Sequence, residues 1–383
     1  MDNNILINIY ELKQVMSRIN NAVEKSVLNP KSGWLELKTI DNSKMLIKVS
    51  NYDYYLEATI AIESNDDSQL NLHATLDSET FISLVSKLDD DYVKLTLNDN
   101  SLFLSTVHNE YNFPLIKENN LAKSLDVISF NDNVEMSGKF DGLILNSISE
   151  VNVKGLIDTM FSKEVQQYIY VDNLSAITFT ENIYVNSFNN KVTGDFKFLL
   201  NQNQAKLLKI FADSYDVYLY INDNVDYDKN YKIKLQSENL KLVMIVQSMQ
   251  MVEKFPAIKL RKLAEVSNDT HAIIDKKQLD RALARLMVFD KKFDITVMNY
   301  SKLVFKKDCV ELVSIKNKNV EKVTYINSVN AYEHESIIRF ADLVKQLKAI
   351  TSREIDISYG NTPAIAINSG NLIQLIPEIQ AGR

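Results

Sequence analysis

The residues that usually carry covalent, acid–base or metal chemistry are few in this sequence and stand far apart. A single cysteine, Cys309, excludes a disulfide framework and a multi-cysteine metal site, and we expect it to be a small buried residue in a strand. The four histidines show no spacing typical of a metal site: His73, His108, His271 and His334. Neighbouring carboxylates at Asp89 and Asp90 fall in a predicted exposed turn. We therefore expect no metal, no cofactor and no enzyme active site.

Lysine and arginine are the remaining candidates, because they recur on the polar sides of predicted helices. On residues 276–289, for example, Arg281 and Arg285 lie opposite the apolar face. Such cations can contact phosphates without reading a base sequence, although an ordinary solvated helix face has the same pattern. The net charge of -7 and the pI near 5.3 argue against a general basic surface that holds nucleic acid. Any role in nucleic-acid binding must account for this acidity.

The elements that would position these cations occur in the same order three times, with a period of roughly 130 residues. Amphipathic helices are predicted to open the copies at residues 10–25, 140–151 and 276–289. Second helices, each followed by a hairpin, are predicted at residues 79–88, 202–212 and 340–350. The sequence thus predicts an α+β fold of three repeated domains, each of antiparallel sheets with two helices. We place the domains at residues 1–122, 123–264 and 265–383.

The ends of the copies and the segments between them also show a pattern. Each copy is predicted to end in an apolar strand that runs into proline, at Phe113-Pro114, Phe255-Pro256 and Ile376-Pro377. Residues 117–124 and 264–270 are polar and are predicted to be linkers. Hydrophobic residues make up 45% of the chain without a long apolar run, and the N-terminus has no secretory signal pattern. We therefore expect no membrane span and a cytoplasmic location.

Several local stretches, taken together with this threefold order, resemble those of a known protein family. They are residues 76–88 (LDSETFISLVSKL), 152–161 (NVKGLIDTMF) and 282–293 (ALARLMVFDKKF), together with the Phe255-Pro256 turn. In this order the stretches resemble the bacterial DNA sliding clamps, the β subunit family of DNA polymerase III. The resemblance implies a head-to-tail homodimer that forms a ring around duplex DNA and tethers the replicative polymerase without being an enzyme.

The resemblance also assigns the cations on the helices. In a ring of this type the helices line the hole, and the following residues are expected to face DNA: Lys13, Arg18, Lys25, Lys87, Lys206, Lys209, Lys277, Arg281, Arg285, Lys345 and Lys348. Encirclement holds DNA topologically, so a modest set of weak phosphate contacts is enough and the outer surface can be acidic. The first helix of the second copy is an exception, since it carries Asn146, Ser149 and Glu150 where a cation is expected.

Two further sites follow from the resemblance. The dimer interface is expected to include Tyr111 and Phe113 on one edge and Val288 and Phe289 on the opposing element, although these four could equally fill domain cores. A pocket between the second and third domains is expected to bind a short peptide of the polymerase and of the clamp loader. Its residues are Lys154, Ile157, Leu174, Ala176, Ile177, Pro256, Leu260, Pro363, Leu375, Ile376 and Pro377.

The predicted pocket departs from the family pattern. Residues 173–176 (NLSA) lack the His-Arg pair usual in that segment, and the C-terminus lacks the common Pro-x-Arg ending. A divergent clamp, for example one encoded by a phage, would show such departures. The main alternative is a β-rich structural or interaction protein, such as a virion component, that is built from the same repeats and does not encircle DNA.

Overall fold

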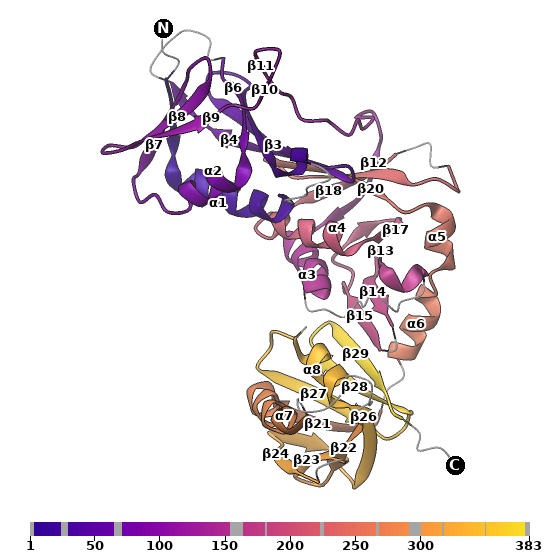
Figure 1. Cartoon of the computed structure of the whole chain (residues 1–383). Helices are drawn as coiled ribbons and strands as arrows, with labels where there is room; N and C mark the ends of the chain where they lie inside the picture. The colour runs from indigo at the N-terminus through magenta and orange to yellow at the C-terminus, as the bar shows by residue number, and fades with distance from the viewer. Residues whose placement is uncertain are drawn as a thin grey trace. The chain divides into compact units, whose positions relative to one another are not determined.

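We describe the protein from a computed structural model (Figure 1). The described residues are 4–23, 30–64, 71–153, 164–180, 182–222, 226–265, 268–290, 300–315, 318–348 and 350–379. The chain forms two compact units, one of residues 1–146 and 206–249 and the other of residues 147–205 and 250–383.

The first unit contains most of the N-terminal elements and three strands from later in the chain. Its helices are α1 (Ile9–Ile19), η1 (Asn20–Ala22), η2 (Pro30–Gly33), α2 (Ser78–Val85) and η4 (Leu208–Phe211). Its first strands are β1 (Asn4–Asn8), β2 (Trp34–Thr39), β3 (Lys44–Ser50), β4 (Tyr54–Ala61), β5 (Glu63–Ser64) and β6 (His73–Asp77). The others are β7 (Tyr92–Leu97), β8 (Ser101–Ser105), β9 (Glu110–Pro114), β10 (Lys117–Glu118), β11 (Leu121–Ala122), β12 (Met136–Phe140), β18 (Val217–Ile221), β19 (Tyr231–Gln236) and β20 (Leu240–Val246).

The second unit contains the rest of the strands. Its helices are η3 (Glu164–Gln167), α5 (Met249–Lys254), α6 (Ala257–Ala264), α7 (Lys276–Asp290) and α8 (Phe340–Lys348), while α3 (Gly142–Val153) and α4 (Gln202–Leu207) run across the division between units. Its first strands are β13 (Ile169–Asp172), β14 (Ser175–Phe179), β15 (Ile183–Ser187), β16 (Thr193–Gly194), β17 (Lys197–Leu200), β21 (Thr270–Asp275) and β22 (Tyr300–Phe305). The others are β23 (Cys309–Ser314), β24 (Val320–Thr324), β25 (Asn327–Val329), β26 (His334–Arg339), β27 (Glu354–Tyr359), β28 (Ala364–Ser369) and β29 (Leu372–Pro377).

Helix α1 shows why these sequences form amphipathic helices. Asn8 caps its N-terminus, because the side-chain oxygen accepts hydrogen bonds from the amides of Tyr10 (2.9 Å) and Glu11 (3.3 Å). Leu12, Met16 and Ile19 follow at helical spacing and are buried. The apolar face therefore packs on the sheet, and the polar face, with its lysine and arginine, is left to solvent.

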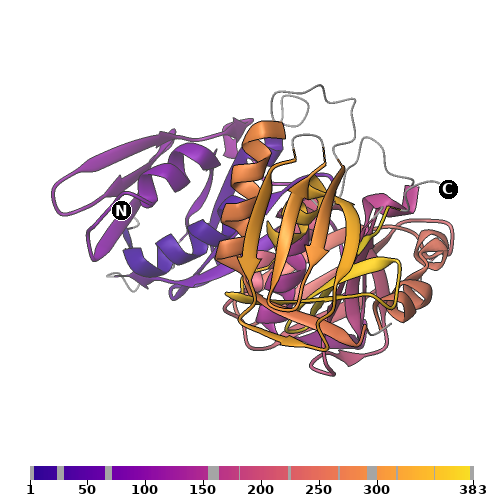
Figure 2. The same ribbon diagram turned by 90° about the horizontal axis from the view of Figure 1, so that it is seen from below.

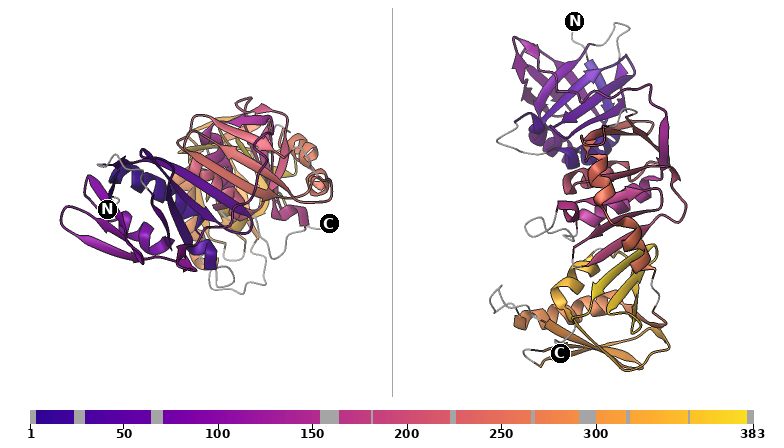
Figure 3. Two further views of the ribbon diagram at one scale, coloured as in Figure 1. Left: turned by 90° about the horizontal axis from the view of Figure 1, so that it is seen from above. Right: turned by 90° about the vertical axis from the view of Figure 1, so that its right-hand side faces the viewer.

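Both units are built from antiparallel sheets. In the first unit, neighbouring strands follow the orders β5-β1-β7-β8-β9 and β12-β18-β19-β20-β4-β3-β2-β6. In the second unit, the orders are β17-β13-β14-β15-β29-β28-β27-β21-β25 and β24-β23-β22-β26. Figure 2 shows α7 alongside the strands of the four-stranded sheet, and the right-hand view of Figure 3 shows the short helices α5 and α6 in succession.

Two ladders join segments that are far apart in the sequence. Strand β20 pairs with β4, from Leu240 opposite Ala58 to Met244 opposite Tyr54. Strand β15 pairs with β29, from Ile183 opposite Leu375 to Asn186 opposite Leu372. These ladders run between the predicted first and second copies and between the predicted second and third copies. Sheets are therefore continuous across the predicted copies.

The α+β class, the antiparallel sheets and the repeated strand-then-helix order are confirmed. Helices begin directly after β1, β6, β21 and β26, as the repeat predicts. Cys309 lies fully buried in β23, as expected, and burial raises the pKa of its thiol. The boundaries of the three predicted domains remain predictions.

Three local predictions were wrong. Phe255-Pro256 does not end a strand but lies between α5 and α6, where Pro256 occupies the N-cap position of α6. The predicted linker 117–124 contains the hairpin β10–β11, since Asn119 and Asn120 adopt positive φ of 52° and 64°. The first helix is shorter than predicted, because regular α geometry ends at Ile19 and a 3₁₀ turn follows.

Candidate nucleic-acid and partner interfaces

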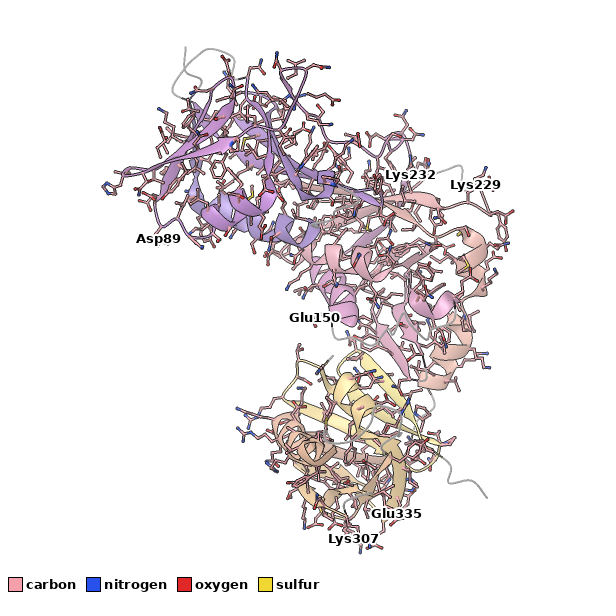
Figure 4. All side chains as sticks on the ribbon, viewed as in Figure 1. Asp89, Glu150, Lys229, Lys232, Lys307 and Glu335 are labelled. Atoms are coloured by element: carbon pink, nitrogen blue, oxygen red, sulfur yellow. The ribbon has the colours of Figure 1, made fainter. Side chains whose placement is uncertain are left out.

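In the first unit, α1 and α2 lie side by side and expose a polar face (Figure 1). Lys13 Nζ lies 3.6 Å from a carboxylate oxygen of Asp89, in the turn after α2 (Figure 4). Arg18 donates a hydrogen bond of 2.9 Å to Asp213. These two predicted DNA-facing cations are therefore already paired with carboxylates of the same unit.

The other predicted cations of the first unit are exposed. Lys87 follows α2, Lys206 lies in α4 and Lys209 lies in η4. Within the described part of the chain, none of the three has a carboxylate within ion-pair distance. Their ammonium groups are available to an external anion. Lys25, also predicted to face DNA, lies outside the described residues.

In the second unit, α7 and α8 also carry both paired and unpaired cations. Arg285 binds Glu321 of β24 with two hydrogen bonds of 2.7 and 2.6 Å, and this pairing lowers the pKa of Glu321. Lys277 and Arg281 on α7 are exposed, and no described carboxylate lies within ion-pair distance of either. Helix α8 exposes two further cations of this kind, Lys345 and Lys348. The apolar faces of both helices are buried, so these cations are on their solvent side.

Helix α3 lacks cations, as its sequence indicates. Glu150 lies toward its C-terminal end (Figure 4), and burial together with the nearby Glu150 charge raises the pKa of Tyr184. Ser149 is buried, so it cannot contribute to a surface. A basic lining that used all the first helices would therefore be interrupted at α3.

The residues predicted at the dimer interface lie at two sheet edges. Strand β9, with Tyr111 and Phe113, is the terminal strand of its sheet. Phe113 is 5% exposed and packs edge-on against Phe81 with ring centroids 5.1 Å apart, so it contributes to the core. Val288 and Phe289 are 62% and 52% exposed near the end of α7, which packs along the edge strand β24. The helix end therefore presents apolar surface beside an open strand edge.

The residues predicted for the peptide pocket are only partly brought together. Strands β14, β15 and β29 are adjacent in one sheet, and Leu260 of α6 is buried where the helix packs on β15 and β29. Ala176, Ile177 and Ile376 are buried in this sheet, and Leu375 is 8% exposed. Lys154 and Ile157 lie outside the described residues.

Two pairs of the predicted pocket residues remain at the surface or near it. Pro363 and Pro377 are exposed and lie beside each other, since Glu378 donates a 2.9 Å hydrogen bond to the Pro363 carbonyl. Leu174 is 48% exposed in the turn between β13 and β14, whereas Pro256 lies beside α6 and lines a separate cavity. The described residues thus give a set of surface anchors around a buried sheet rather than one closed pocket.

Arg261, which was not predicted as a site residue, ties α6 to the turn between β13 and β14. Its guanidinium donates to Asp172 and, over 2.8 Å, to Ser175. Both partners are mostly buried, since the Arg261 side chain is 19% exposed and that of Asp172 10%. The partners are separated by more than eighty residues, so no local pattern could have linked them.

Comparison with known proteins shows the fold. No protein-family model matches the chain, and no curated protein matches its sequence. Solved structures do match along the whole length. A DNA polymerase III β subunit from Thermotoga maritima has a TM-score of 0.75 at 15% identity, with 99% of this chain and 100% of that chain covered.

Two other structures give the same result. The β subunit of a DNA polymerase from Streptococcus pyogenes has a TM-score of 0.74 at 14% identity, covering 99% of this chain and 100% of that chain. A DNA polymerase sliding clamp from Bacillus subtilis has a TM-score of 0.71 at 13% identity, with both chains covered in full. The chain therefore has the fold of the bacterial sliding clamps, and the resemblance drawn from its sequence is confirmed at the level of the fold.

The described residues contain no helix that is both long and apolar enough to cross a membrane. They also contain no cluster of three or more His, Cys, Asp or Glu side chains arranged to hold a metal ion.

Proposed function

We propose that the chain is a DNA sliding clamp that encircles duplex DNA in the cytoplasm and tethers a replicative polymerase for processive synthesis. The observation that carries this proposal is the likeness to DNA polymerase III β subunits over 99% of this chain and 100% of the matched chain. In this proposal the protein binds and positions its partners and performs no bond chemistry of its own. The polymerase and a clamp loader would bind through a short peptide near Leu174, Pro363 and Pro377.

The distribution of paired and unpaired cations supports a sliding role. Duplex DNA carries about one charge per 1.7 Å, so many strong phosphate contacts would hold the protein in place. Here Lys13, Arg18 and Arg285 are already bonded to carboxylates. The unpaired lysines on η4 and α8 would make a few exchangeable contacts, and encirclement would supply retention. An acidic protein can therefore stay on DNA without gripping it.

A ring requires two copies, and the two open sheet edges suggest how they join. In a head-to-tail dimer, β9 of one protomer would meet β24 of its partner edge to edge. Val288 and Phe289, which are exposed beside β24, would be covered in that contact. Burying such side chains is favourable by about 1.5 to 3 kcal/mol each.

Retention on DNA of different topology tests this function. The protein is loaded onto nicked circular plasmid, the salt concentration is raised, and the plasmid is then linearised. A clamp is expected to survive the salt on the circle and to run off the linear DNA, because only topology retains it. A protein that dissociates equally from both forms as salt rises, while dimeric in solution, is an ordinary phosphate binder.

A variant at the proposed interface links retention to ring closure. Phe289→Glu places a charge on the apolar edge of α7 and is expected to give monomers in sedimentation and no retention on the circle. Tyr52→Glu, at an aromatic residue that is 74% exposed in the turn after β3, is the matched control. If Phe289→Glu stays dimeric and is retained, the two copies join through another surface.

A further inference from the structure

A cavity of about 900 Å³ lies beside α5 and α6 in the second unit. Its floor is aromatic: Tyr170 of β13 stacks on Phe255 with ring centroids 5.1 Å apart, and Phe179 meets Phe255 edge-on at 5.3 Å. The phenol of Tyr170 is neutral at pH 7 even at the ordinary tyrosine pKa of 10, and burial raises its pKa further, to about 12. The floor is therefore apolar, uncharged and fixed by ring packing.

The wall formed by α6 exposes apolar side chains. Ile258 is 71% exposed and Leu263 is 43% exposed, and both line the cavity. Large apolar side chains beside a cavity of this size are typical of a surface that another molecule covers. The cavity is open to solvent, so it can accept part of a longer chain.

The cavity forms a groove along α6, and the charge around this groove is opposite in sign to that of the whole protein. Lys197, Lys259 and Lys262 line it together with one carboxylate, Glu253. Lys197 and Glu253 are 3.9 Å apart, which leaves their attraction weak. Lys259 and Lys262 are exposed, and no described carboxylate lies within ion-pair distance of them. The groove thus combines an apolar base with a net positive rim on a chain of net charge -7.

The groove is also preformed. Arg261 fastens α6 to Asp172 and Ser175, and it lies 6.0 Å from the centre of the Tyr170 ring. Buried Leu260 and Ala264 hold the opposite side of the helix on the sheet. A ligand would therefore meet a wall that is already in place, which lowers the entropy cost of binding.

We propose that this groove docks an acidic peptide segment of a partner protein, with a bulky aliphatic or aromatic side chain as its anchor. The anchor would cover Ile258 and Leu263 above the Tyr170–Phe255 pair, and flanking carboxylates would meet Lys259 and Lys262. Among the described residues that were predicted for the clamp peptide pocket, only Pro256 lines this groove. Docking of such a peptide in this groove does not require that the protein is a clamp.

Three labelled six-residue probes test the proposal by fluorescence polarisation with the full chain. The first has a central Leu-Phe pair flanked by two acidic residues on each side. In the second, lysines replace the acidic residues, and in the third, alanines replace the Leu-Phe pair. The first probe is expected to bind more tightly than both others, because it alone offers both charge and anchor. Equal binding of the acidic and basic probes would overturn the proposal.

Variants and exchange mapping locate the binding. Lys262→Glu is expected to weaken the acidic probe about fivefold, and Ile258→Ala about tenfold. Both residues are exposed, so folding should be unaffected, and circular dichroism checks this. Lys307→Glu, in the turn between β22 and β23 (Figure 4), makes the same charge change elsewhere and should leave binding unchanged.

Hydrogen exchange separates this groove from the predicted peptide pocket. Bound probe is expected to protect amides of α5 and α6. Protection confined to β29, or equal weakening by Lys307→Glu and Lys262→Glu, would show that the probe binds elsewhere or by net charge alone, and either result overturns the proposal.

Discussion

Charged groups inside the first unit and charged groups on the helix faces have different surroundings. The side chain of Glu36 in β2 is 3% exposed and is surrounded by donors. His73 lies 3.2 Å from it, Lys48 3.4 Å, and the amide of Leu125 donates over 2.9 Å. The lysines of α8, in contrast, point to solvent and have no described carboxylate within ion-pair distance.

This contrast separates structural charges from charges that can bind a ligand. A buried carboxylate that is fully hydrogen-bonded stabilises the fold and has no capacity left for a partner. An exposed lysine contributes little to stability, yet it can bind a phosphate and release a counterion. The more exposed a charged side chain is, the less its substitution should change the free energy of unfolding. The effect of the substitution on DNA binding should increase in the same order.

The largest effect on stability is expected from Glu36. Burial alone would raise its pKa, but the close contact with His73, the hydrogen bond from the Leu125 amide and the charge of Lys48 hold the pKa at about 2, below the ordinary value of 4.5. A lowered pKa stabilises the folded state above pH 4.5, and this stabilisation is lost as the pH falls from 4.5 toward 2. The amount is about 3 kcal/mol.

Denaturant unfolding at pH 7 and pH 3 measures this term. From pH 7 to pH 3, the free energy of unfolding of Glu36→Gln should fall by about 2 to 3 kcal/mol less than that of the unmodified chain, because the glutamine amide does not titrate. Glu110→Gln, at an exposed carboxylate of β9, should behave like the unmodified chain. An identical acid dependence for Glu36→Gln would mean that Glu36 is not held as a buried carboxylate.

The next largest effect is expected from Arg261, whose mostly buried pair with Asp172 is more exposed than Glu36. Arg261→Leu leaves the Asp172 carboxylate without its partner and should lower the free energy of unfolding by about 2 kcal/mol. The double variant Arg261→Leu with Asp172→Leu removes both charges and should recover part of that loss. A double variant as unstable as the single one would show that packing of α6, and not the unpaired charge, controls stability here.

Elements with local patterns could be predicted from the sequence, whereas pairing between distant segments could not. Helix α7 was predicted at residues 276–289 because its apolar residues recur at helical spacing. The ladders β4–β20 and β15–β29 carry no such local sign, since each strand only shows that it is apolar. Tertiary packing selects the partner.

The errors have similar physical causes. Phe255-Pro256 was read as a strand end, although the following residues AIKLRKLA favour a helix that can begin after proline. Recognising that helix would have revealed the exposed Ile258 and Leu263, and with them one wall of the groove. The aromatic floor could not have been found in this way, because Tyr170 and Phe255 are joined only in three dimensions.

Substitutions of cations on the exposed helix faces are expected to change DNA binding and not stability. Lys345→Glu with Lys348→Glu should leave unfolding unchanged. The slope of log affinity for plasmid DNA against log salt should become less negative by roughly 2 per chain, since each lost phosphate contact removes about 0.9. Lys307→Glu with Lys318→Glu, at turns of the β22–β24 sheet, is the control of equal charge. A control with the same change in slope would indicate a general charge effect.

The smallest effect is expected where an exposed cation is already paired. Arg285 is 59% exposed and bonded to Glu321, whereas Arg281 on the same helix has no described carboxylate within ion-pair distance. Arg285→Ala should leave the free energy of unfolding unchanged and alter the salt slope less than Arg281→Ala does, because DNA would have to displace Glu321. Equal slopes for the two variants would mean that Glu321 releases Arg285 when DNA binds. Cations that form ion pairs on the helices would then exchange their carboxylate partners for DNA phosphates. Pairing in the free protein would no longer indicate which cations contact phosphate.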